Sequence, residues 1–77
     1  MKLENLGLNQ TVLTFQNGTK ILFSYNTPVA AYVVQQGFVK TKTNHSVTTT
    51  KHIQKWLNGC YATPVSQDYL NNLLSTQ

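Results

Sequence analysis

The first half of the chain arranges apolar and polar positions in short runs of β type. Two such runs, within QTVLTFQNGTKILFSY, flank the dipeptide Asn17-Gly18. This dipeptide is the strongest short-range signal for a β-hairpin, because both central residues of a type I′ turn need positive φ angles. We therefore predict a two-residue loop that places Val12 opposite Phe23. Both faces of the resulting ribbon carry apolar residues.

Two further β-type runs follow this hairpin. Proline lacks the N–H group that a sheet ladder needs, so Pro28 predicts that the second strand ends near Tyr25. The apolar run VAAYVV predicts a third strand and FVKTKT a fourth, joined by a short turn with Gly37 at positive φ. The opening segment MKLENLGLN fits either a short turn or an extended lead-in that packs on the core.

The pattern changes to a helical period in the second half of the chain. Four apolar residues fall at positions i, i+3, i+4 and i+7, which form one face of a helix: Ile53, Trp56, Leu57 and Cys60. We predict a helix over about residues 48–58, with its N-cap oxygen from Ser46 or Thr48. Gly59 stands where a helix C-cap belongs.

A second helix is predicted over about residues 66–75. Ser66 supplies its N-cap, Pro64 stands just before it, and Asp68 falls in the first turn, where the helix dipole favours a negative charge. The buried face of this helix comprises Tyr69, Leu70, Leu73 and Leu74.

Together these elements predict an α+β fold in a single domain that spans residues 1–77. We expect a small antiparallel sheet of three to four strands, over about residues 10–42, followed by both helices packed on one face of the sheet. A chain of this length buries only about 60% of the surface that its unfolded form exposes, so the core is small.

Charge is sparse in this chain. Only 10% of the residues are charged, compared with about 25% in typical soluble domains. There are six lysines and no arginine, the acids are Glu4 and Asp68, and the net charge is +4. This excess favours polyanionic partners, whereas the lack of arginine argues against bidentate recognition of bases or phosphates. In the alternative interpretation, the lysines only keep a sparsely charged protein soluble.

The lysines concentrate in KTKTNHSVTTTKHIQKW, residues 40–56, a segment without an acid. Free backbone N–H groups at a helix N-terminus bind anions, and neighbouring hydroxyl and ammonium groups suit a phosphate. The candidate nucleic-acid or anion-binding residues are Lys40, Lys42, Ser46, Thr48, Thr49, Lys51 and Lys55. The alternative is a threonine-rich loop and helix cap with solvated lysines.

Five aromatic residues are candidates to stack on nucleic-acid bases: Tyr25, Tyr32, Phe38, Trp56 and Tyr61. Trp56 lies on the apolar stripe of the first predicted helix, which favours a core position. Tyr32 alternates with Ala31 and Val33, which favours an exposed side chain.

Catalytic and metal-binding chemistry finds little support in the sequence. Glu4 and Asp68 stand near opposite ends of the chain, and no catalytic-triad context or glycine-rich phosphate loop is evident. His45 and His52 have no second cysteine or carboxylate near them, so we expect no metal site, and a partly buried, hydrogen-bonded His52 is the favoured interpretation. We expect no enzyme and no cofactor, and a small core residue at Cys60 rather than a nucleophile.

Cysteine usage and apolar run length bear on the compartment. A single cysteine excludes an intramolecular disulfide, which fits a reducing environment. MKLENLGLNQ lacks the apolar run of a signal peptide, and PVAAYVV is far too short to span a membrane. The expectation is a soluble protein inside the cell, with no membrane partner.

Two segments, SYNTPVAA and SVTTTKHIQKWL, are the most distinctive of the chain. On these segments the sequence resembles small uncharacterised proteins, a domain of unknown function, from tailed bacteriophage genomes, and the similarity covers most of the chain. The resemblance implies expression in the cytoplasm of an infected bacterial host. It supplies neither an activity nor functional residues.

Two functional hypotheses follow. The first is a small non-enzymatic phage accessory protein that binds nucleic acid, or another polyanion, through the basic strand-loop-helix segment, with low sequence specificity. The second is a protein-interaction module or inhibitor that acts on a host or phage protein, such as an anti-defence factor. It would work through strand addition or as a homo-oligomer, most simply a homodimer.

Overall fold

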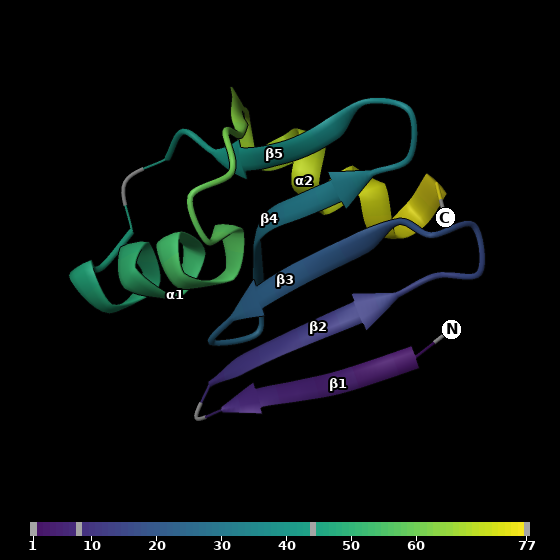
Figure 1. Ribbon diagram of the computed structural model, residues 1–77. Helices are drawn as coiled ribbons and strands as arrows, with labels where there is room; N and C mark the ends of the chain where they lie inside the picture. Colours follow the sequence, from purple (N-terminus) through teal and green to yellow (C-terminus); the bar gives the residue numbers. More distant parts are fainter. Residues whose placement is uncertain (1, 8, 44, 77) are drawn as a thin grey trace.

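The computed structural model describes residues 2–7, 9–43 and 45–76. These residues form a six-stranded sheet and two helices (Figure 1). In chain order the elements are β1 (Lys2–Gly7), β2 (Gln10–Thr14), β3 (Lys20–Ser24), β4 (Thr27–Val33), β5 (Gly37–Thr41), α1 (Val47–Leu57), β6 (Thr63–Val65) and α2 (Gln67–Thr76). The strands lie in this order across the sheet, antiparallel from β1 to β5 and parallel between β5 and β6. The predicted α+β class is confirmed.

The predicted number of strands is too low. The strands expected over residues 10–42 correspond to β2–β5, and the prediction missed β1 and β6 at the two edges of the sheet. All six residues of β1 are exposed, so no alternation of buried and exposed positions marks it as a strand. β6 has three residues and contains Pro64, which an edge strand tolerates.

The β2–β3 hairpin has a three-residue loop rather than the predicted two-residue loop. The N–H of Phe15 donates to the carbonyl of Thr19 at 2.8 Å, and the N–H of Gly18 donates to the carbonyl of Phe15 at 3.0 Å. Within the loop only Gly18 has a positive φ, at 96°, as in a type I turn followed by a bulge. The longer loop shifts the register by one residue, so that Val12 lies opposite Leu22.

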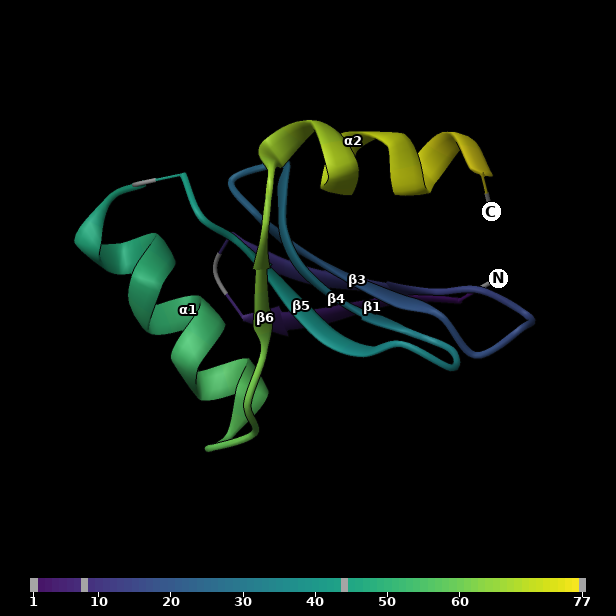
Figure 2. The same cartoon turned by 90° about the horizontal axis from the view of Figure 1, so that it is seen from above.

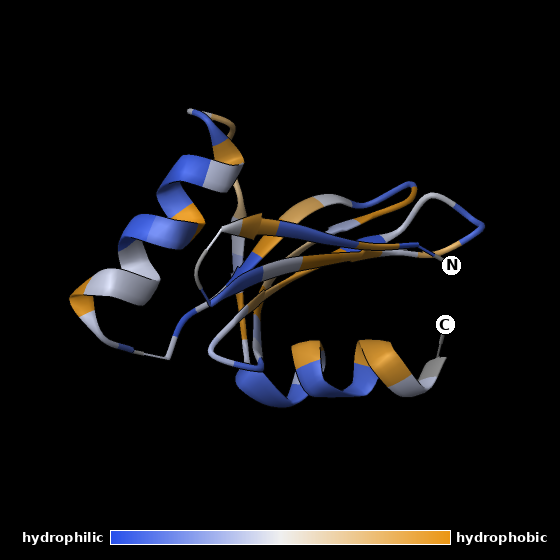
Figure 3. Cartoon of the chain, turned by 90° about the horizontal axis from the view of Figure 1, so that it is seen from below, coloured by the Kyte–Doolittle hydropathy of each residue, from blue (hydrophilic) through white to orange (hydrophobic). Residues whose placement is uncertain are grey.

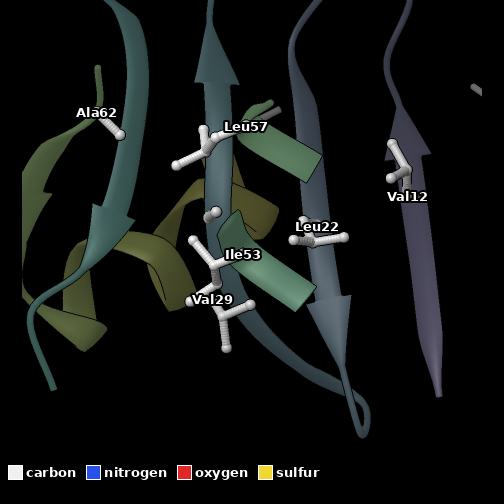
Figure 4. Packing of buried hydrophobic residues seen from close by; sticks show 7 residues of the cluster. Val12, Leu22, Val29, Ile53, Leu57 and Ala62 are labelled. Atoms are coloured by element: carbon white, nitrogen blue, oxygen red, sulfur yellow. The ribbon is translucent and has the colours of Figure 1, made fainter. Parts of the chain in front are cut away.

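One face of the sheet, here called the α1 face, carries α1. Val12, Leu22 and Ala30 lie directly opposite one another on β2, β3 and β4 and therefore share this face. Ile53 and Leu57 of α1 belong to the same buried cluster, together with Val29 and Ala62 (Figure 4).

The opposite face, here called the α2 face, carries α2. Ile21 and Ala31 share this face and pack with Leu70 and Leu73 of α2. The sheet lies between the two helices in Figure 2, and Figure 3 shows the apolar side of α2 turned toward the sheet. The prediction that both helices pack on one face is wrong. Consecutive apolar residues in β3 and β4 leave both faces of the sheet in need of cover, and each helix covers one.

Both predicted helices are confirmed, with boundaries one residue away from the expected ones. Ser46 caps α1, since its Oγ accepts a hydrogen bond from the N–H of Thr49 at 3.2 Å. Ser66 caps α2 in the same way, through the N–H of Tyr69 at 3.1 Å. Asn58 and Gly59 end α1 with φ angles of 50° and 84°.

Candidate anion-binding site

Lys40 and Lys42 stand at the end of β5, beside α1. Lys40 lies opposite Ala30 and therefore points to the α1 face, where it is half-buried. Lys42 follows two residues later, and its N–H donates to the carbonyl of Val65 in β6 at 2.9 Å. This bond fixes the backbone just beyond the end of β5. The side chains of Lys40 and Lys42 therefore project from a backbone that is held by hydrogen bonds.

A hollow of about 220 Å³ separates these lysines from α1. Its lining residues come from the end of β5, the following loop and α1: Lys40, Thr41, Lys42, Thr43, His45, Thr50, Ile53, Gln54 and Leu57. We call it the lysine hollow. Two of the seven candidate residues, Lys40 and Lys42, lie in it, and neither Glu4 nor Asp68 does. The hollow therefore combines two cations with hydroxyl and amide groups and has no carboxylate in its lining.

Two other candidate residues, Ser46 and Thr49, are already hydrogen-bonded within the protein: Ser46 caps α1, and Thr49 joins α1 to the sheet. Thr49 is buried, and its Oγ1 lies 3.1 Å from Ser24 Oγ and accepts a hydrogen bond from Ser46 Oγ at 3.2 Å. Ser24 Oγ is also 2.9 Å from Nδ1 of His52. These hydroxyl groups already have partners within the protein, and Thr49 reaches no external phosphate from this position.

Lys51, Lys55 and Thr48 are exposed on α1. None of the three lines the lysine hollow. The lysines of the candidate segment thus fall into two groups, one at the strand end beside the hollow and one on the exposed surface of the helix.

His45 lies at the edge of the lysine hollow and contacts the start of α2. Its Nε2 is 3.1 Å from Oε1 of Gln67, which also accepts a hydrogen bond from Oγ1 of Thr41 at 2.9 Å. Nε2 of Gln67 donates in turn to the carbonyl of Pro28 at 2.6 Å. Gln67 therefore ties the loop that borders the hollow to two strands of the sheet.

The histidines and the cysteine do not combine into a site. Among the described residues there is no group of three His, Cys, Asp or Glu side chains that could hold a metal ion. The expected hydrogen-bonded, half-buried His52 is confirmed. The expectation of a core position for Cys60 is wrong, since Cys60 is exposed. Asn58 turns the chain out of the helix before the fourth position of the apolar stripe is reached.

A second hollow, of about 320 Å³, lies on the α1 face and is lined by Lys20, Tyr32, Phe38 and Trp56. We call it the aromatic hollow. Ring centroids are 5.0 Å apart between Tyr32 and Phe38 and 5.6 Å apart between Phe38 and Trp56. Trp56, expected in the core, is half-buried: it packs on the buried cluster of the α1 face and also lines this hollow. The other candidate aromatics lie elsewhere, with Tyr25 against His52 and Tyr61 82% exposed.

Sequence reasoning missed the place of Lys20 in this group. Lys20, Tyr32 and Phe38 lie directly opposite one another on β3, β4 and β5. Only the registers of β3 with β4 and of β4 with β5 bring these residues together, and no signal within a single strand reports those registers.

None of the helices in the described parts of the chain is long and apolar enough to cross a membrane.

Fold and site together define a small α+β domain with a helix on each face of its sheet and two hollows on the α1 face. The profile of a family of unknown function, DUF8033, matches residues 1–72, and the chain belongs to this family. The expectation of a domain of unknown function is thereby confirmed. Neither the curated proteins nor the solved structures yield a match.

Proposed function

We propose that this protein is a small non-enzymatic phage accessory protein of the host cytoplasm that binds nucleic acid, or another polyanion, through the lysine hollow. The observation that carries the proposal is that Lys40 and Lys42 line one hollow without a carboxylate. A lysine ammonium is a point charge that attracts a phosphate but does not read a base. We therefore expect binding with low sequence specificity and a strong dependence on salt.

The two groups of lysines supply a matched test. Lys40→Gln/Lys42→Gln and Lys51→Gln/Lys55→Gln remove the same charge, but only the first pair lines the lysine hollow. Binding of a labelled DNA duplex would be followed by fluorescence anisotropy over a range of salt concentrations. The slope of log K against log salt is negative. We expect the first variant to reduce its magnitude by about 0.9 for each lost phosphate contact. The second variant should retain most of the slope.

Two results would contradict this proposal. Equal losses in the two double variants would mean that binding follows net charge and not the hollow. No binding of DNA or RNA at low salt would refute nucleic-acid binding altogether.

A second candidate function is a protein-interaction module that acts as a homodimer or recruits a host or phage protein by strand addition. The observation that favours it is β1, an edge strand with six exposed residues. Leu3 is 70% exposed on this strand. A long, exposed edge with an apolar residue is a template for pairing with another strand.

A further inference from the structure

We infer that the aromatic hollow receives a base of a single-stranded nucleic acid, with Lys20 contacting a neighbouring phosphate. The inference rests on the nucleic-acid binding of the proposed function and names the form of nucleic acid that the α1 face prefers. It concerns residues outside the lysine hollow.

The walls of the aromatic hollow come from three strands and one helix. Lys20, Tyr32 and Phe38 form a row across β3, β4 and β5 on the α1 face. Trp56 of α1 stands beside Phe38 with its ring nearly perpendicular, at 80°. All three rings are half-buried, so each keeps surface open to a ligand, and Lys20 is exposed at the rim.

The chemistry of the lining selects a flat, anionic ligand. Aromatic side chains stack on any nucleobase, because every base has a π face. Aromatic sites also attract cations, but the ammonium group of Lys20 repels a cation at this rim and attracts an anion. A nucleotide combines a π-rich ring, which can stack on the aromatic side chains, with a phosphate, which can contact the ammonium group of Lys20.

The position of the hollow on β5 links it to the lysine hollow. Phe38 and Lys40 are two residues apart on one strand, so their side chains point to the same face, roughly 7 Å apart along the strand. A nucleic-acid backbone held by Lys40 can therefore continue toward Phe38 and Lys20. A base reaches the rings only when it is not stacked within a duplex, which favours single strands.

Trp56 is the only tryptophan of the chain, so its intrinsic fluorescence reports on this hollow. Three probes separate stacking from charge: oligothymidylate, a DNA duplex of equal phosphate content, and heparin. We expect oligothymidylate to quench Trp56 and heparin to leave it unchanged. Tyr32→Leu should weaken oligothymidylate binding by about 5- to 150-fold without changing the binding of heparin.

Two further variants complete the test. Lys20→Gln changes an exposed residue and should leave the fold undisturbed. For single strands it should reduce the magnitude of the slope of log K against log salt by about 0.7. Tyr25→Leu removes a tyrosine that lies against His52, outside the hollow, and should bind like the parent. Far-ultraviolet circular dichroism of each variant verifies folding.

The outcomes separate the inference from the proposed function. If oligothymidylate binds but Trp56 is not quenched and Tyr32→Leu binds like the parent, stacking is refuted and polyanion binding stands. If Tyr32→Leu loses binding while Lys40→Gln/Lys42→Gln does not, stacking stands and the lysine hollow is refuted. Absence of any binding at low salt overturns both.

Discussion

Ser24 joins the sheet to α1 through two side chains of the helix. Its buried hydroxyl lies 3.1 Å from Oγ1 of Thr49 and 2.9 Å from Nδ1 of His52. A buried hydroxyl without a partner is costly, so such a contact fixes where the helix sits on the sheet. Thr49 therefore has a structural explanation that does not require a ligand.

We predict that Thr49→Val destabilises the protein by about 1–2 kcal/mol, because Oγ1 of Thr49 loses its hydrogen bonds with Ser24 and Ser46. Valine preserves the shape and the β-branched character of threonine, so packing and helix propensity change little. The measurement is the free energy of unfolding from urea denaturation. Nucleic-acid affinity should be unchanged, because the hydroxyl group is enclosed by the protein.

Thr48→Val is the matched control for this prediction. Thr48 precedes Thr49 on the same helix but is exposed, so its substitution should change stability by less than about 0.5 kcal/mol. Equal effects at the two positions would contradict a stabilising role for the buried hydroxyl group of Thr49. A loss of nucleic-acid binding in Thr49→Val would show that this hydroxyl group also acts outside the packing contact.

At the scale of elements, local signals decided what could be predicted. The caps at Ser46 and Ser66 and the helical stripe are encoded within a few residues, and both helices appear where the sequence places them. β1 has no buried residue and β6 has three residues, so neither has a pattern of its own. These two strands depend on pairing with β2 and β5, which no local signal reports.

The candidate site shows the same limit. Lys40 and Lys42 could be predicted because only one residue separates them in the sequence, and the structure places them together in one hollow. The proximity of Lys20 to Phe38 could not be predicted, because it depends on the registers of β3 with β4 and of β4 with β5. Burial of Thr49 likewise depends on Ser24, which lies far from it in the chain.

The β2–β3 loop supplies a test at this scale. Asn17 accepts a hydrogen bond at its Oδ1 from the N–H of Thr19, at 3.0 Å. We predict that Asn17→Gly destabilises the protein by roughly 1 kcal/mol, because it removes this bond and adds freedom to the unfolded chain. Asn17→Asp keeps the oxygen and should be close to neutral. Both values come from urea denaturation midpoints.

The two-residue turn predicts the reverse for the same substitution. In a type I′ turn both central residues need positive φ, and glycine suits such a position well. A neutral or stabilising Asn17→Gly would therefore contradict the three-residue loop and the register of Val12 opposite Leu22.

At the scale of the whole molecule, the two faces and the two edges of the sheet differ. Each face has its helix, and β6 is a short strand with a proline. β1 is the long edge and pairs with β2 alone among the described strands. A sheet with one such edge can extend by pairing with a second copy of itself.

Symmetry and charge together favour one register of such a pair. Two antiparallel β1 strands around a two-fold axis perpendicular to the sheet keep their faces aligned, so odd residues oppose odd and even oppose even. With Leu3 opposite Leu3, Lys2 of each copy stands opposite Glu4 of the other. With Glu4 opposite Glu4, like charges would meet and repel. The first register therefore brings together the exposed Leu3 side chains of the two copies and places Lys2 of each copy opposite Glu4 of the other.

This arrangement predicts a homodimer whose stability depends on the sign pattern of β1. Glu4→Lys should weaken the dimer, because Lys2 would then oppose a lysine, and Lys2→Glu/Glu4→Lys should restore it. Leu3→Lys should give monomers, since two lysines would meet at the axis. Sedimentation equilibrium measures each association constant. A parent chain that is monomeric at high concentration, or a double reversal no stronger than the single change, would rule out pairing through β1 in this register.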